Sequence, residues 1–400
     1  MQYDFDSVID RRQTGCAKWD AAPFIFGSKD IIPMWVADMD FPIAKPITEA
    51  IKKRADHEVY GYNMPAMPSL TEAIINRLRR NYDWEVAPEW IVMTPGVVAA
   101  LFAAVKAYTK PGDSVLHQGP VYYPFWSAIK ENGCHVANNQ LVQNGDRYEI
   151  DFEDLESHFK TRMDLRPVPS RVRMMIMCNP HNPVGRVWDK DELIKMGEIV
   201  VKGNALMVAD EIHCELLLNG AKHIPFAKLS PEFEQKSITC MAPSKTFNLA
   251  GLEASVIIIP DKATRRKFNE ARAGIMPGIN TFGLVALEAA FDHGDEWLTQ
   301  LLAYLEKNLD YLARFFQDNI PEIKVFKPEG TYLVWLDCRK LGMDDMELRR
   351  FMREKAKIGM DDGYLFGPSG SGFQRMNIAC PKSTLTEALN RMASAVKALR

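Results

Sequence analysis

Short apolar runs alternate with helical patterns between about residues 90 and 260, and this alternation constrains the fold more than any other feature. Val172 to Cys178 and Ala205 to Ala209 are almost continuously apolar, as strands are when both faces of a sheet are covered. A helical pattern at Val97 to Tyr108 separates two further strand-like runs, Ile91 to Thr94 and Ser114 to His117. We therefore predict an α/β fold with a large, mostly parallel sheet flanked by helices.

The character of the chain changes after Phe282. A long helical pattern at Glu288 to Gln317 is followed by short strand-like runs and a last helix from Ser383 to Leu399. This order is typical of a smaller α+β unit. We predict a large domain at 46–285 and a small domain built from 1–45 and 286–400.

Composition excludes several classes of protein. The 400 residues are 47% hydrophobic and 25% charged, with a formal net charge of −3, so no basic surface for nucleic acid is indicated. The seven cysteines have no CxxC spacing, which argues against a zinc site or a disulfide framework. Without a signal peptide or a spanning apolar run, we expect a cytoplasmic protein with no membrane partner and no metal.

Lys245 is the most suggestive single residue. It lies in a Gly/Pro/Ser/Asn-rich segment, Ala242 to Leu252, which predicts a turn between the buried strands Ser237 to Met241 and Ala254 to Ile259. A lysine amine held in the interior has a lowered pKa and can attack a carbonyl. Pyridoxal phosphate, bound as a lysine Schiff base, uses this chemistry. The alternative is an ordinary surface lysine.

Asp210 is a candidate for the acid that such a cofactor needs. It ends the apolar run before Glu211 and His213, and a carboxylate buried there is costly unless it is paired with a cation. The pyridinium nitrogen of the cofactor would be such a cation. Asp210 could instead cap a helix. His213 could reach the ring oxygen, or could be structural.

Other residues suit the remaining parts of the cofactor and a substrate. Gly96, with Val97 and Val98, links a strand to a helix start that can bind a phosphate through backbone N–H groups. Several side chains could complete the site: Ser244 and Tyr62 as hydroxyl donors, Tyr122 as a stacking ring, Asn182 as an amide donor in a rigid Asn-Pro turn, and Arg375 as a bidentate carboxylate ligand.

Together these segments resemble the fold-type I pyridoxal-phosphate enzymes of the class I/II aminotransferase group, in the cystathionine β-lyase branch of MalY/PatB-type C–S lyases. The segments that carry the resemblance are Lys18-Trp19-Asp20, Trp35 to Pro42, Tyr60-Gly61-Tyr62, Asn179 to Trp188, Asp210 to His213, Ser244 to Leu252 and Arg375 to Pro381. They span nearly the whole chain in the expected order.

The resemblance implies a role for each residue. Lys245 is implied as the Schiff-base lysine, Asp210 as the partner of the pyridine nitrogen, and Tyr62 as a ligand of the phosphate in the neighbouring subunit of a homodimer. The implied substrate contacts are Arg375, Ala37, Tyr122 and Asn182. The chain departs from relatives at Ala242 and from many aminotransferases at Glu253, where a carboxylate would repel a phosphate.

The implied activity is α,β-elimination of L-cystathionine, or of a related Cβ-thio amino acid, to a thiol such as homocysteine with pyruvate and ammonia. This would be a step of methionine biosynthesis, with Tyr62 or Tyr122 protonating the leaving sulfur. Two alternatives stay open: an aminotransferase that uses the same lysine and aspartate, and a regulatory protein-binding module on the same fold. The glycine-rich stretch Gly367 to Gly372 follows no strand-to-helix pattern and is a weak candidate for a nucleotide loop.

Overall fold

A seven-stranded sheet forms the centre of the molecule. The structure is a computed structural model that describes residues 1–64, 67–160 and 171–399. β10 runs opposite to the other six strands, so the sheet is mostly parallel, as the sequence predicts. In spatial order the strands are β2 (Ile91–Thr94), β10 (Ser255–Ile258), β9 (Ser237–Met241), β8 (Leu206–Asp210), β7 (Val172–Cys178), β3 (Ser114–His117) and β4 (His135–Asn138).

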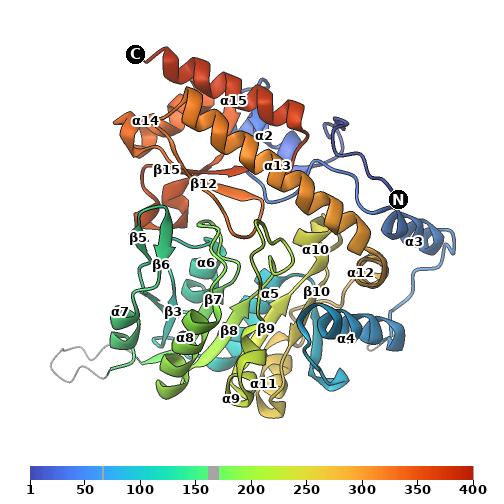
Figure 1. Cartoon of the computed structure of the whole chain (residues 1–400). Helices are drawn as coiled ribbons and strands as arrows, with labels where there is room; N and C mark the ends of the chain where they lie inside the picture. Colours follow the sequence, from blue (N-terminus) through green and yellow to red (C-terminus); the bar gives the residue numbers. More distant parts are fainter. Residues whose placement is uncertain (65–66, 161–170, 400) are drawn as a thin grey trace.

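Helices cover both faces of this sheet, which explains why its strands are apolar on both sides (Figure 1). Along β7, Ile176 and Cys178 pack on one face, and Met175 and Met177 pack on the other. The first face is covered by α5 (Val97–Tyr108), α6 (Pro124–Lys130) and α11 (Lys262–Arg272). The second is covered by α7 (Phe152–Ser157), α8 (Lys190–Lys202) and α9 (Pro231–Gln235).

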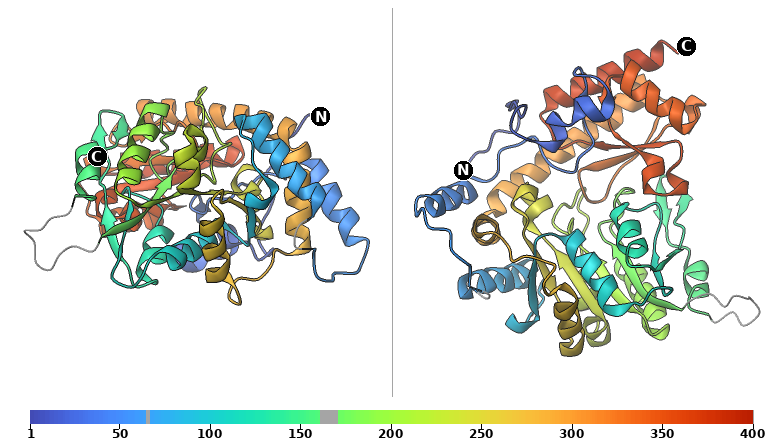
Figure 2. Two further views of the ribbon diagram at one scale, coloured as in Figure 1. Left: turned by 90° about the horizontal axis from the view of Figure 1, so that it is seen from below. Right: turned by 180° about the vertical axis from the view of Figure 1, so that it is seen from behind.

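A smaller antiparallel sheet lies toward the C-terminus, beneath α13 (Asp295–Asn319) and α15 (Lys382–Lys397) (Figure 1). Its strands, in spatial order, are β11 (Lys324–Phe326), β12 (Leu333–Asp337), β15 (Phe373–Asn377) and β14 (Asp361–Asp362). The N-terminal segment joins this part of the molecule, because β1 (Ile32–Pro33) pairs in parallel with β13 (Ile358–Gly359). Figure 2 shows the N-terminal segment passing beside these C-terminal elements.

The remaining elements connect or flank the two sheets. They are α1 (Ala17–Asp20), α2 (Ala22–Phe26), α3 (Lys45–Ala55), α4 (Pro68–Tyr82), β5 (Val142–Asn144), β6 (Arg147–Glu149), α10 (Pro243–Thr246), α12 (Thr281–His293) and α14 (Asp345–Arg350). One continuous apolar cluster contains residues of α3, α4, α12, α13, α15 and β12. The two predicted domains would therefore share a core, and their bounds stay a prediction.

The prediction of one long helix at Glu288 to Gln317 is wrong. The segment forms α12 and α13, and the break falls at Gly294. A Cβ at Gly294 would overlap the ring of Phe247. The ring therefore packs against the chain at the residue where α12 ends and α13 begins, and only glycine leaves room for it there. Apolar periodicity continues through both helices, and periodicity alone does not reveal the turn between them.

The prediction of a plain turn around Lys245 needs a smaller correction. Pro243–Thr246 forms one helical turn, α10, with Pro243 at its first position. A 3-10 turn, Ala250–Leu252, follows. Among the described residues, no helix combines the length and the apolar character needed to cross a membrane.

Candidate active site

The residues singled out from the sequence lie at one edge of the central sheet. Asp210 is the last residue of β8, and Asn182 follows β7 after a short turn. Gly96 follows β2, Tyr122 follows β3 and Lys245 follows β9. Each of these five strands runs in the same direction, so their carboxyl ends meet at one edge, where α/β sheets place their ligands.

Lys245 points from α10 toward the N-terminal segment. Its Nζ donates a hydrogen bond to the carbonyl oxygen of Ala37 at 2.8 Å. Burial lowers the pKa of Lys245 to about 8, with a further contribution from the Arg375 cation. An appreciable fraction of the amine is therefore neutral near pH 8 and able to attack a carbonyl.

Asp210 is a buried carboxylate without a cationic partner. It is 4% exposed, and its Oδ1 accepts one hydrogen bond, from the backbone N–H of Ile212 at 3.2 Å. The neighbouring strands place Cys178 and Cys240 in register with it, so its flanks are thiols. No ion pair involving Asp210 occurs in the described part of the chain, and burial raises its pKa to about 7. The Lys245 ammonium lowers this pKa only in part, so the site suits a further cation in direct contact with the carboxylate.

His213 is buried and lies three residues after Asp210 in the chain. Its Nδ1 has no hydrogen-bond partner among the described residues, and its ring meets the ring of Tyr332 edge to face at 6.4 Å between centroids. Burial holds the pKa of His213 well below its usual value, so the imidazole is neutral. A neutral, unpartnered nitrogen in this position suits a polar group on a bound ring.

Arg375 on β15 reaches across from the smaller sheet and joins the same site. Its Nη1 donates to Oδ1 of Asn182 at 2.9 Å, and its Nη2 donates to the carbonyl oxygen of Trp35 at 3.1 Å. Its Nη2 also forms an ion pair with Asp361. The backbone N–H of Tyr122 donates to the carbonyl oxygen of Asn182 at 3.1 Å. The structure therefore brings Arg375, Asn182 and Tyr122 together.

The start of α5 is open to an anion. Gly96 precedes it with φ 141°, a conformation that favours glycine, and no side chain caps the helix. Glu253 is exposed, so its carboxylate is not buried against this helix start. The guanidinium of Arg272 donates to the carbonyl oxygen of Met93 at 3.0 Å and brings a positive charge to the strand that leads into Gly96.

The segment 35–41, which contains Ala37, forms one wall of the site, and most of its support was not foreseen from the sequence. Asn377 Nδ2 donates to the carbonyl oxygens of Val36 and Asp38, each at 2.6 Å. Asn248 Nδ2 donates to the carbonyl oxygens of Met39 and Phe41, each at 3.0 Å. These amides fix the Ala37 carbonyl that Lys245 contacts.

A buried charge cluster holds the same segment from the other side. Lys18, whose side chain is fully buried, pairs with Asp40 at 2.7 Å, and Arg11 pairs with both Asp38 and Asp40. Although burial alone would raise it, the Lys18 ammonium keeps the pKa of Asp40 below its usual value. In the sequence, the signal for this cluster is the presence of Asp38 and Asp40 within an otherwise apolar stretch, because carboxylates buried there need cationic partners.

Tyr62 does not join the other residues. It projects from the loop between α3 and α4, with a relative exposure of 109%. No hydrogen bond or ring contact links it to another described residue. Ser244, by contrast, lies partly buried beside Lys245 in α10.

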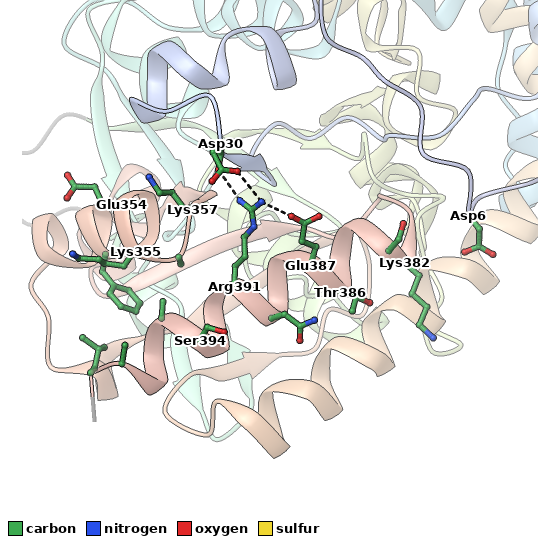
Figure 3. Close-up of a pocket in the computed structure, with 17 residues that line it drawn as sticks. Asp6, Asp30, Glu354, Lys355, Lys357, Lys382, Thr386, Glu387, Arg391 and Ser394 are labelled. Carbon is green, nitrogen blue, oxygen red and sulfur yellow. Dashed lines mark hydrogen bonds and ion pairs between the residues drawn. The ribbon is translucent and has the colours of Figure 1, made fainter.

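A wide groove on another part of the surface is separate from this site (Figure 3). It has a volume of about 1430 Å³ and lies along α15, where Arg391 pairs with Asp30 and Glu387. None of the residues discussed above as candidate cofactor or substrate ligands lines it.

Comparisons with known proteins agree with this geometry. Residues 29–392 match the family model for aminotransferase class I and II. Over 98% of its length, the chain is 44% identical to cystathionine beta-lyase PatB of Bacillus subtilis, all of which is covered. The chain therefore belongs to the aminotransferase class I and II family.

Two solved structures are similar throughout. Cystalysin from Treponema denticola, which contains a pyridoxal 5'-phosphate cofactor, superimposes with a TM-score of 0.94 at 39% identity, with all of both chains covered. The PLP-bound C-S lyase from Staphylococcus hominis gives a TM-score of 0.91 at 32% identity, with 99% of this chain and 98% of that chain covered. The fold is that of these pyridoxal-phosphate enzymes.

Replacing Lys18 with methionine should destabilise the protein by about 3 kcal/mol, because the buried carboxylate of Asp40 loses the one of its two cations that is itself fully buried. Urea unfolding followed by circular dichroism measures the change. Lys45→Met, which removes an exposed partner of Glu49, is the matched control and should shift stability by less than about 0.5 kcal/mol. Equal effects of the two substitutions would contradict the structural role of the cluster.

Proposed function

We propose that this protein is a pyridoxal-phosphate-dependent carbon–sulfur lyase that cleaves the Cβ–S bond of L-cystathionine or a related Cβ-thio amino acid. The observation that carries the proposal is the buried, unpaired carboxylate of Asp210 at the same strand edge as a lysine whose pKa is lowered to about 8. The full-length similarity to a cystathionine beta-lyase and to two pyridoxal-phosphate-bound structures supports it.

The residues present fit the cofactor at each of its ends. Asp210 would face the pyridine nitrogen, where a cation removes the cost of its buried charge. His213 and Asn182 would lie at the ring oxygen, and Tyr122 would stack on the ring. The open start of α5 at Gly96 to Val98, with Ser244, would hold the phosphate.

The chemistry divides between the cofactor and the protein. When bound, pyridoxal phosphate supplies an electron sink that stabilises negative charge at the substrate Cα. Arg375 would bind the substrate carboxylate and so direct the Cα–H bond toward Lys245. Lys245, as a neutral amine, would then take the Cα proton.

Departure of the sulfur completes the elimination. The Cβ–S bond breaks as the thiolate leaves, and the aminoacrylate that is released hydrolyses to pyruvate and ammonia. Burial raises the pKa of Tyr122 to about 12, so its phenol keeps the proton that a leaving thiolate can accept. With L-cystathionine the thiol is homocysteine, which would give this chain a place in methionine biosynthesis.

The purified protein, loaded with pyridoxal phosphate, should release pyruvate, ammonia and homocysteine in equal amounts from L-cystathionine without an added keto acid. Lys245→Ala should abolish this release, because the base and the point of attachment are lost together, while circular dichroism shows the fold intact. Coupled assays measure pyruvate and ammonia, and a thiol reagent measures homocysteine. Product formation that requires a keto acid would favour an aminotransferase, and full turnover by Lys245→Ala would end the proposal.

We further propose a homodimer in which each subunit completes the other's site. Tyr62 supports this idea because it is fully exposed within a run of exposed apolar side chains, Val59, Tyr60 and Met64. The run is anchored by Asn63, which bonds to Ile279 and Thr281 and so presents a fixed surface. An aromatic hydroxyl held outside its own site suits a phosphate in a second copy.

Mixing Lys245→Ala with Tyr62→Ala subunits should restore activity that neither variant has alone. A hybrid dimer has one site with both lesions and one with neither, so random association gives up to roughly a quarter of wild-type activity. Subunit exchange is verified by native mass spectrometry, and Tyr62→Ala is first shown to be impaired. Absence of recovery in verified hybrids would place Tyr62 in its own subunit's site.

A further inference from the structure

Asp361 faces the arginine that the proposed function assigns to the substrate carboxylate. The two residues are paired in register across β14 and β15, and the Asp361 carboxylate forms an ion pair with Nη2 of Arg375. Both side chains are largely buried, at 12% and 3% exposure respectively. In this structure, therefore, the guanidinium of Arg375 already binds a carboxylate of the protein itself.

The donors of Arg375 leave no free pair for a second carboxylate. Nη2 donates to the Trp35 carbonyl oxygen and to Asp361, while Nη1 donates to Asn182. Nε has no partner among the described residues. A bidentate carboxylate uses either Nε with Nη2 or Nη1 with Nη2, and both arrangements need Nη2. An incoming substrate carboxylate must therefore displace a partner of Nη2.

Of the two partners, Asp361 is the one free to leave. The Trp35 carbonyl belongs to the backbone, and the two residues after it are fixed by hydrogen bonds from Asn377 and Lys245. The Asp361 carboxylate can move by rotation of its side chain. We propose that Asp361 occupies the substrate-carboxylate subsite as an internal competitor and is exchanged for the substrate; this rests on the proposed function of Arg375.

The exchange has an electrostatic consequence. Burial raises the pKa of Asp361 although Arg375 acts in the opposite direction, and losing Arg375 to a second anion raises it further. Asp361 thus has a lower pKa while it pairs with Arg375 and a higher pKa once the substrate carboxylate has taken Arg375. At a pH between these two values, exchange makes Asp361 take up a proton, so the substrate carboxylate binds more tightly as the pH falls through this interval. The other groups that act on it or feel its charge are Asp362, Arg353, Tyr122 and Tyr123.

The test uses propionate, a carboxylate without an amino group, and the loaded enzyme. Calorimetric titration in HEPES and in Tris at equal pH gives the dissociation constant and the protons taken up. Asp361→Asn should bind propionate at least about fivefold more tightly above neutral pH, because the competing charge is gone, and should lose both the pH dependence and the proton uptake of the wild type. The KM for L-cystathionine should fall in the same variant.

Asp337→Asn is the matched control. Asp337, on β12 of the same sheet, pairs with Arg339 and makes no hydrogen bond or ion pair with Arg375, so propionate binding should stay unchanged. Weaker or unaltered binding in Asp361→Asn would overturn the competitor role, as would absence of proton uptake by the wild type, a measurement that requires no variant. If Arg375→Lys binds propionate like the wild type, the carboxylate lies elsewhere and the assigned role of Arg375 falls as well.

Discussion

The carboxylate of Asp210, buried at the end of β8, is the constraint on which the rest of the site depends. A carboxylate with one backbone donor and no ion-pair partner among the described residues is held there at a cost, which its pKa of about 7 reflects. The cost is imposed by packing, because helices cover both faces of the sheet and thiols flank the residue in the sheet. A pyridinium bound beside Asp210 would offset this cost, so the arrangement favours the protein with the cofactor bound over the protein without it.

The site also depends on parts of the chain that are far apart in sequence. Lys245 and Asn182 come from the central sheet, Arg375 comes from the smaller sheet, and the segment 35–41 comes from the N-terminus. The hydrogen bonds of Asn377, on β15, tie the last two together, and the buried Lys18–Asp40 pair braces the segment 35–41 from within the N-terminal part. Lys245, its backbone acceptor and Arg375, the residue proposed to bind the substrate carboxylate, are thereby fixed in one geometry, which favours directed removal of one proton.

The sequence was sufficient for the large sheet because its strands carry a strong local signal. β7 and β9 were predicted with their observed bounds, since buried parallel strands are continuous apolar runs. The break between α12 and α13 was missed because Gly294 interrupts no apolar period. The one-turn helix at Lys245 was missed because Pro and Ser indicate a turn and a helix start equally well.

Contacts within the site were less accessible to sequence reasoning. The parallel direction of β8 and β9 decides that Asp210 and Lys245 share an edge, and the alternation of elements predicted a mostly parallel sheet. Nothing local to Asp361 indicates that it faces Arg375, because the pairing arises from the register of two short strands. Likewise, only the folded chain shows that Asn248 and Asn377 hold the segment around Ala37.

The most direct test of this account is the ionisation of Asp210, followed by infrared difference spectroscopy of its carboxyl group, with Asp210→Asn to assign the band. In protein freed of pyridoxal phosphate, the group should titrate near pH 7, as burial dictates. After the cofactor is added, the carboxylate should stay ionised down to at least about pH 5, because a pyridinium cation now faces it. An ordinary carboxyl pKa that does not change when the cofactor binds would contradict the account.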